Sequence, residues 1–86
     1  MIFVTIQEEI EEILTQEYKP TSLKVINNSH LHKGHVGDDG SGNTHFRVEI
    51  TTDVFKNYNR LECHRMIYKS LNSYMNDPIH ALEIIL

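Results

Sequence analysis

The sequence predicts a single α+β domain with the element order helix, strand, strand, helix, strand. Apolar residues recur at three- and four-residue steps in residues 5–17 and again in residues 60–75, as on the buried face of a helix. Residues 44–52 alternate between apolar and polar, as in a half-buried strand. With 86 residues and no internal repeat or linker, the chain (residues 1–86) is one domain with room for one sheet and two helices.

The first helix is expected over residues 5–17. Thr5 and Glu8 fit a capping box at its start, and Pro20 closes it. Glutamates near the start of a helix suit the positive end of its dipole, so we expect a solvated face here rather than a catalytic carboxylate pair. The apolar stripe is Ile6, Ile10, Ile13 and Leu14, and the acidic face is Glu8, Glu9, Glu11 and Glu12.

Two strands are expected next, over residues 22–28 and 44–52. In the first strand, Leu23 and Val25 alternate with Lys24. The faces of the second strand are Phe46, Val48 and Ile50 on one side and His45, Arg47, Glu49 and Thr51 on the other. His45 therefore projects away from the core side chains, and we expect it to make a polar contact with a neighbouring strand.

A second helix is expected over residues 60–75, after a short connection over residues 53–59 that is anchored by Phe55. Its stripe is Leu61, His64, Ile67, Tyr68, Leu71, Tyr74 and Met75. We expect His64 to be a core histidine bonded to a neighbouring carbonyl. Residues 76–78 end in a proline, which cannot continue the helix.

Composition limits the classes of function. The formal net charge is -4, so no overall field draws the chain to nucleic acid or to an anionic membrane. The single cysteine, Cys63, can neither form an internal disulfide nor hold a metal cluster alone. No apolar run approaches the roughly 18 residues that span a bilayer. We therefore expect a protein of the bacterial cytoplasm, or of an organelle matrix if a transit peptide is missing.

Residues 28–46 hold four of the six histidines around a loop rich in Asp, Gly and Ser. The four are His30, His32, His35 and His45. Imidazole is a common metal ligand and titrates near neutrality, so this cluster indicates a role with metals or protons. The alternative is a solvated loop, because turns favour Gly, Asp, Asn and Ser for backbone reasons.

The expected topology brings a further histidine to this loop. A connection of about 15 residues lets the first two strands pair antiparallel. The last strand, residues 79–86 with Leu82, Ile84 and Leu86 in register, then returns parallel through a right-handed crossover. His80 would lie at the loop end of the sheet, where two imidazoles leave coordination positions for ligands from another protein. The second helix would start at the opposite end.

The chain resembles the BolA family, whose members are small proteins with a type II KH-like fold. The resemblance rests on NNSHLHKGH, GNTHFRVEI, LECHRMIYKSLN and DPIHALEI, and it covers the chain from about Ile6 to Ile84. Its strongest marks are Thr44, His45 and Phe46, then His64 and Arg65, then His80, Ala81 and Leu82. It implies a three-stranded mixed sheet with the helices packed on one face.

The resemblance also implies a partner. BolA-like proteins pair with monothiol glutaredoxins and share a [2Fe-2S] cluster, for which the glutaredoxin cysteine and glutathione supply the sulfurs. The implied metal ligands here are His80 and His32, with His35 and His30 as alternatives for the loop ligand. The implied role is a non-enzymatic adaptor in iron–sulfur cluster assembly, trafficking and iron homeostasis. The isolated chain would carry no cofactor and would be a monomer or a weak homodimer.

Two other classes of function remain to be weighed. BolA-like proteins are also described as DNA-binding transcriptional regulators, but residues 53–59 lack the glycines of a GxxG loop. The candidate nucleic-acid contacts are Lys56, Arg60, Arg65 and Lys69, and binding would be weak and salt-sensitive. A small hydrolase or transferase is disfavoured, because Cys63 and His64 would point about 100 degrees apart on a helix.

Overall fold

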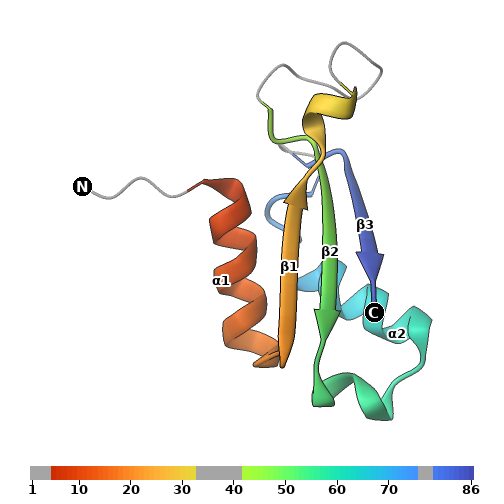
Figure 1. The fold of residues 1–86 in the computed structure, drawn as a ribbon. Coiled ribbons are helices and arrows are strands. Elements are labelled where there is room, and N and C mark those ends of the chain that lie inside the picture. Colours follow the sequence, from red (N-terminus) through yellow and green to blue (C-terminus); the bar gives the residue numbers. More distant parts are fainter. Residues whose placement is uncertain (1–4, 33–41, 76–78) are drawn as a thin grey trace.

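The computed structural model describes residues 5–32, 42–75 and 79–86. Its elements are α1 (Ile6–Tyr18), β1 (Ser22–Asn27), the 3-10 helix η1 (Ser29–His32), β2 (His45–Thr51), the 3-10 helix η2 (Asp53–Asn57), α2 (Arg60–Ser70) and β3 (Ala81–Ile85). Figure 1 shows the predicted order of helices and strands, with two short 3-10 helices added. None of the helices in these ranges combines the length and apolar character needed to cross a membrane.

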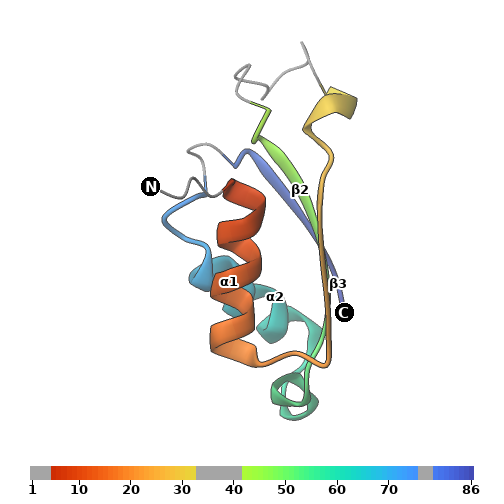
Figure 2. The same cartoon turned by 60° about the vertical axis from the view of Figure 1, so that its left-hand side comes forward.

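The three strands form one mixed sheet in the order β1-β2-β3. β2 pairs antiparallel with β1, with Val25 opposite Val48, and parallel with β3, with Phe46 opposite Leu82. Both helices lie on the same side of the sheet, as Figure 2 shows. The predicted α+β class, the mixed pairing and the single helical layer are confirmed.

The core lies between this helical layer and the sheet. Thr5 caps α1, since its hydroxyl accepts a hydrogen bond from the Glu8 N–H at 3.1 Å, as predicted. Burial alternates along β3 and along β2 from Phe46 onward, as a sheet covered on one face requires, and β1 buries Val25. The buried apolar cluster is Ile10, Leu14, Tyr18, Val25, Phe46, Val48, Ile50, Ile67, Leu71, Ile79, Leu82 and Ile84.

The second helix is shorter than predicted. α2 ends at Ser70 rather than at residue 75. The chain then tightens into a turn in which the Tyr74 N–H donates to the Leu71 carbonyl at 2.9 Å, and Met75 bridges to Ile79. Leu71 and Ile79 are fully buried, so this turn allows both ends of the connection to reach the core. The predicted stop at residues 76–78 lies outside the described residues.

The predicted stripe of the second helix is wrong in part. Leu61 is 58% exposed, whereas Cys63 is only 2% exposed and takes the inward position. The Nε2 atom of His64 is buried without a hydrogen-bond partner in the described structure, so the predicted bond to a carbonyl is not formed. Tyr68 lies at the margin of the core, where its hydroxyl donates to the Leu82 carbonyl of β3 at 2.8 Å. Leu86, predicted to face the core, is also exposed.

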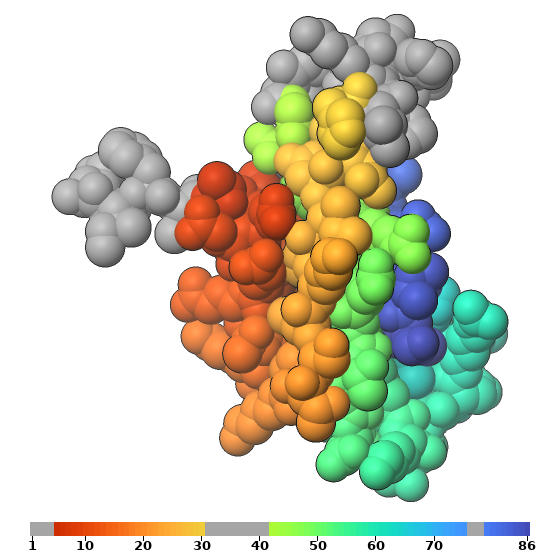
Figure 3. Space-filling view, viewed as in Figure 1, coloured from red at the N-terminus to blue at the C-terminus, as the bar shows by residue number. Residues whose placement is uncertain are grey.

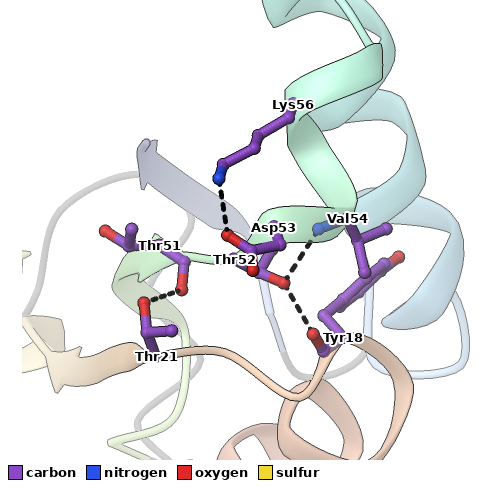
Figure 4. Close-up of polar contacts among 7 residues, drawn as sticks. All are labelled: Tyr18, Thr21, Thr51, Thr52, Asp53, Val54 and Lys56. Atoms are coloured by element: carbon purple, nitrogen blue, oxygen red, sulfur yellow. Dashed lines mark hydrogen bonds and ion pairs between the residues drawn. The ribbon is translucent and has the colours of Figure 1, made fainter.

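The end of the sheet next to η2 is fastened by hydroxyl groups. The Thr52 hydroxyl donates to the Tyr18 carbonyl at 2.6 Å and accepts from the Val54 N–H at 3.3 Å (Figure 4). The Thr21 hydroxyl donates to the Thr51 carbonyl at 3.2 Å in the same view. These bonds join the end of α1 to the end of β2.

The side chain of Tyr18 extends this junction to α2. Its hydroxyl donates to the Met66 carbonyl at 3.0 Å and lies 2.6 Å from the Ser70 hydroxyl. The Ser70 hydroxyl also contacts the Glu17 carboxylate. The Tyr18 ring packs against Phe55 with a centroid distance of 5.0 Å. One buried aromatic side chain thereby ties α1 to α2 and η2.

Tyr18→Phe keeps the ring but removes both hydroxyl contacts. We expect the free energy of unfolding to fall by about 1–2 kcal/mol, because the part-buried hydrogen bonds of the Tyr18 hydroxyl to α2 are lost, although the Met66 carbonyl still accepts from the Ser70 hydroxyl. Urea denaturation monitored by far-UV circular dichroism measures the change. Tyr58→Phe is the matched control, since Tyr58 is 46% exposed, and it should leave the midpoint unchanged. Equal midpoints for Tyr18→Phe and the parent chain would contradict the assignment.

Candidate functional site

The predicted histidine site lies at the end of the sheet where β1 finishes and β2 and β3 begin, at the top of Figure 1. We call residues 27–32, 42–46 and 79–81 the histidine edge. Figure 3 shows the residues before β2 lying beside the end of β1 on this part of the surface. The Asn28 N–H donates to the His45 carbonyl at 2.8 Å, which continues the β1–β2 pairing up to the edge.

Ser29 organises the histidine edge. It is 3% exposed, and its hydroxyl accepts hydrogen bonds from the Thr44 N–H at 2.9 Å and the His45 N–H at 3.1 Å. The Asn27 side chain accepts from the Ser29 N–H at 3.0 Å and donates to the Gly42 carbonyl at 2.8 Å. Ser29 was not predicted from the sequence. The Asn-x-Ser spacing, which is typical of an Asx turn, is the signal that could have identified it.

His80 reaches this edge through its backbone. Its N–H donates to the Thr44 carbonyl at 2.7 Å, and the Ala81 N–H donates to the same oxygen at 3.1 Å. The His80 side chain is exposed. The prediction that His80 lies at the same end of the sheet as His45 is therefore confirmed.

His45 lies beside His80 but in a different environment. It is only 8% exposed, although it projects from the face of the sheet that the helices do not cover. Its Nδ1 atom lies 2.8 Å from the Thr44 hydroxyl. Its ring centroid lies 5.6 Å from that of His80, with the two planes tilted by 51°. The His45 side chain thus contacts Thr44, which precedes β2, and the ring of His80, which precedes β3. The predicted polar contact with a neighbouring strand stays a prediction.

The candidate loop ligands are only partly described. His30 is exposed in η1, and η1 ends at His32 on the histidine edge. The His32 side chain and all of His35 lie outside what the structure describes. Within the described ranges, no group of three or more His, Cys, Asp or Glu residues is arranged to hold a metal ion.

The donors on this edge nevertheless fit the iron of a cluster completed by another protein. The exposed imidazole of His80, just before β3, and the histidines of η1 are the ligand type that replaces thiolate on one iron of a Rieske-type [2Fe-2S] centre. Cys63 does not belong to this set, because its Sγ lies 3.9 Å from the Phe55 and Tyr58 carbonyl oxygens, by η2. Burial, with a smaller effect of Glu62, raises the pKa of the Cys63 thiol above its ordinary value.

The candidate nucleic-acid residues lie away from the histidine edge. Three of them lie on α2 and one on η2, and all are exposed: Lys56, Arg60, Arg65 and Lys69. The Lys56 ammonium lies 3.1 Å from the Asp53 carboxylate (Figure 4). Figure 1 places η2 and the start of α2 at the bottom of the sheet, so the predicted separation into two surfaces is confirmed.

Comparison with known proteins identifies the family. The BolA family model, described as BolA-like protein, matches residues 14–86. The chain belongs to the BolA family. It is 36% identical over 81 residues to the DNA-binding transcriptional regulator BolA of Haemophilus influenzae, covering 94% of this chain and 75% of that protein. The resemblance inferred from the motifs is thus confirmed, and neither the family description nor this relative's name indicates an enzyme.

Solved structures of BolA domains share the fold. BolA1 from Arabidopsis thaliana superposes with a TM-score of 0.86 at 30% identity, covering 98% of this chain and 92% of that one. The BolA domain of SufE1 from the same plant gives a TM-score of 0.85 at 32% identity with the same coverage. The fold of this chain is therefore that of solved BolA domains.

Ser29→Ala should destabilise the histidine edge. We expect the free energy of unfolding to fall by about 1–3 kcal/mol, because buried backbone N–H groups lose their acceptor. Chemical denaturation gives the total effect, and amide hydrogen exchange should localise it to Thr44 and His45. Ser73→Ala, at an exposed position, is the control. Unchanged exchange at Thr44 in Ser29→Ala would contradict the role given to this hydroxyl.

Native Cys63 should react with an aromatic disulfide reagent at pH 8 at least about tenfold more slowly than the urea-unfolded chain, since a buried thiol of raised pKa forms little thiolate. The pKa of this thiol is higher in the folded state than in the unfolded state. Its contribution to stability is therefore fully present at pH values below the unfolded-state pKa, and it is lost as the pH rises through the folded-state pKa. A Cys63→Ala, Ser73→Cys chain, with its thiol exposed, should react at the unfolded rate. Equal rates for native and unfolded parent chain would refute the burial of Cys63.

Proposed function

We propose that this protein is a non-enzymatic adaptor that pairs with a monothiol glutaredoxin to share a [2Fe-2S] cluster, in iron–sulfur cluster assembly or trafficking and in iron homeostasis. The observation that carries the proposal is the exposed imidazole of His80 at the sheet end where η1 presents further histidines. Family membership supports it. The proposed setting is the cytoplasm or an organelle matrix, where a lone cysteine stays reduced.

The chain's own part in this function is to offer nitrogen ligands from two places. His80 is the first, and its backbone is fixed by the Thr44 carbonyl. His32 is the preferred second ligand, with His35 and His30 as alternatives. Two imidazoles leave the other positions to thiolates of the glutaredoxin cysteine and glutathione. A shared cluster with this mixed ligation would have a higher reduction potential than one held by thiolates alone. Neither partner alone then offers the full ligand set.

His80→Ala should abolish the effect of this chain on the cluster. We expect the visible absorption and circular dichroism of a glutaredoxin–glutathione [2Fe-2S] preparation to change when the parent chain is added, and not when His80→Ala is added. Lys24→Ala, exposed on β1, is the control and should behave like the parent. Among His32→Ala, His35→Ala and His30→Ala, the first should lose most of the effect. A full spectral change with His80→Ala would overturn the proposal.

A second candidate function is DNA-binding regulation. It is favoured by the name of the Haemophilus relative and by the exposed basic residues on α2. Fluorescence anisotropy with duplex DNA at 50 and 200 mM salt would test it. Binding that is lost in an Arg60→Ala, Arg65→Ala chain but kept in His80→Ala would establish it as separate from the metal role. The absence of binding at the lower salt concentration would exclude it.

A further inference from the structure

His45 is buried, whereas the next residues on the same face of β2 are not. Arg47 and Glu49 project from the same uncovered face of β2, and their side chains are both 38% exposed. His45 instead borders a hollow of about 160 Å³ that is also lined by Asn28, Phe46, Ala81 and Glu83. Burial therefore sets His45 apart from Arg47 and Glu49 on this face of β2.

Thr44 contacts both residues of this pair, the imidazole of His45 and the backbone of His80. Its hydroxyl lies 2.8 Å from His45 Nδ1, and its carbonyl accepts the His80 N–H at 2.7 Å. Thr44 is fully buried, and its own N–H is bonded to Ser29. The His45 ring and the His80 backbone are therefore both anchored at one buried residue.

The two rings that make this contact differ in their exposure to solvent. The centroids are 5.6 Å apart, within the range of aromatic contact, and the planes are tilted by 51°. His45 is buried and bonded to Thr44, whereas the His80 side chain is exposed. An exposed side chain samples several rotamers unless a neighbour excludes some of them. The buried His45 ring is thus placed to restrict the rotamers of the exposed His80 side chain.

We propose that His45 is a positioning residue for His80: held by Thr44, its ring confines the His80 imidazole to the orientation in which it meets the cluster. This inference rests on the proposed function for its purpose, but the confinement is a property of the isolated chain. Outer groups that orient a metal-binding histidine commonly change affinity by 10- to 100-fold when removed.

Side-chain NMR of the isolated chain tests the confinement directly. Three-bond couplings should show one dominant χ1 rotamer for His80 in the parent and rotamer averaging in His45→Ala. Thr44→Val, which keeps the shape of the residue but removes the hydroxyl, should give partial averaging and serves if His45→Ala fails to fold. Arg47→Ala is the matched control on the same face and should leave the His80 couplings unchanged. Unaltered couplings in both His45→Ala and Thr44→Val would overturn the proposal.

The glutaredoxin complex supplies a second readout. His45→Ala should keep the nitrogen hyperfine couplings of the reduced cluster but shift its visible circular dichroism and speed cluster loss about tenfold. Loss of a nitrogen coupling in His45→Ala would make His45 a ligand and would also overturn the positioning role. If the parent chain forms no shared cluster while His45→Ala still averages the His80 rotamers, the proposed function fails and the confinement stands.

Discussion

The geometry of this protein depends on the hydrogen bond from the His80 N–H to the Thr44 carbonyl, 2.7 Å long. This bond lies at the start of the parallel pairing of β3 with β2. In the register that follows, Ala81 lies opposite His45 and Ile84 lies opposite Val48. Because side chains alternate along a strand, a shift of one residue would move Leu82 and Ile84 out of the core. Core packing and the position of His80 are therefore fixed by the same register.

The two ends of the central strand, β2, lie in chemically different parts of the molecule. Its antiparallel partner β1 leads to η1 at one end, and its own C-terminal end leads through η2 into α2 at the other. The histidine edge is fastened by Ser29 and Thr44, and the opposite end by Tyr18 and Thr52. In both places, buried hydroxyl groups satisfy backbone groups where regular pairing stops, as the cost of unpaired buried polar groups requires.

Alternation and helical spacing predicted the fold well where one face is buried. Val48 and Ile50 followed the pattern, and so did Ile10 and Leu14 of α1. The pattern failed where rotation about the helix axis decides burial, since apolar spacing alone placed Leu61 inward, whereas Cys63 occupies that position. The end of α2 was misplaced because burial of Leu71 and Ile79 overrode a periodic pattern that continued beyond Ser70.

At the site, the sequence predicted which histidines share an end of the sheet but not how they are held. His80 could be placed because chain direction follows from topology, whereas the burial of His45 runs against the alternation that predicted a solvent-facing side chain. Ser29 stood within a histidine-rich stretch, and its Asn-x-Ser spacing indicates a turn but not which backbone groups its hydroxyl would bind. Its role arises only when β1 and β2 pair and two backbone N–H groups converge on one hydroxyl.

The most direct test of the account is the measurement of scalar couplings across backbone hydrogen bonds in the isolated, isotope-labelled chain. The account predicts a cross peak that joins the amide nitrogen of His80 to the carbonyl carbon of Thr44. A His80 amide coupled instead to a carbonyl near the Thr51 end of β2 would place its imidazole away from η1 and would contradict the shared site.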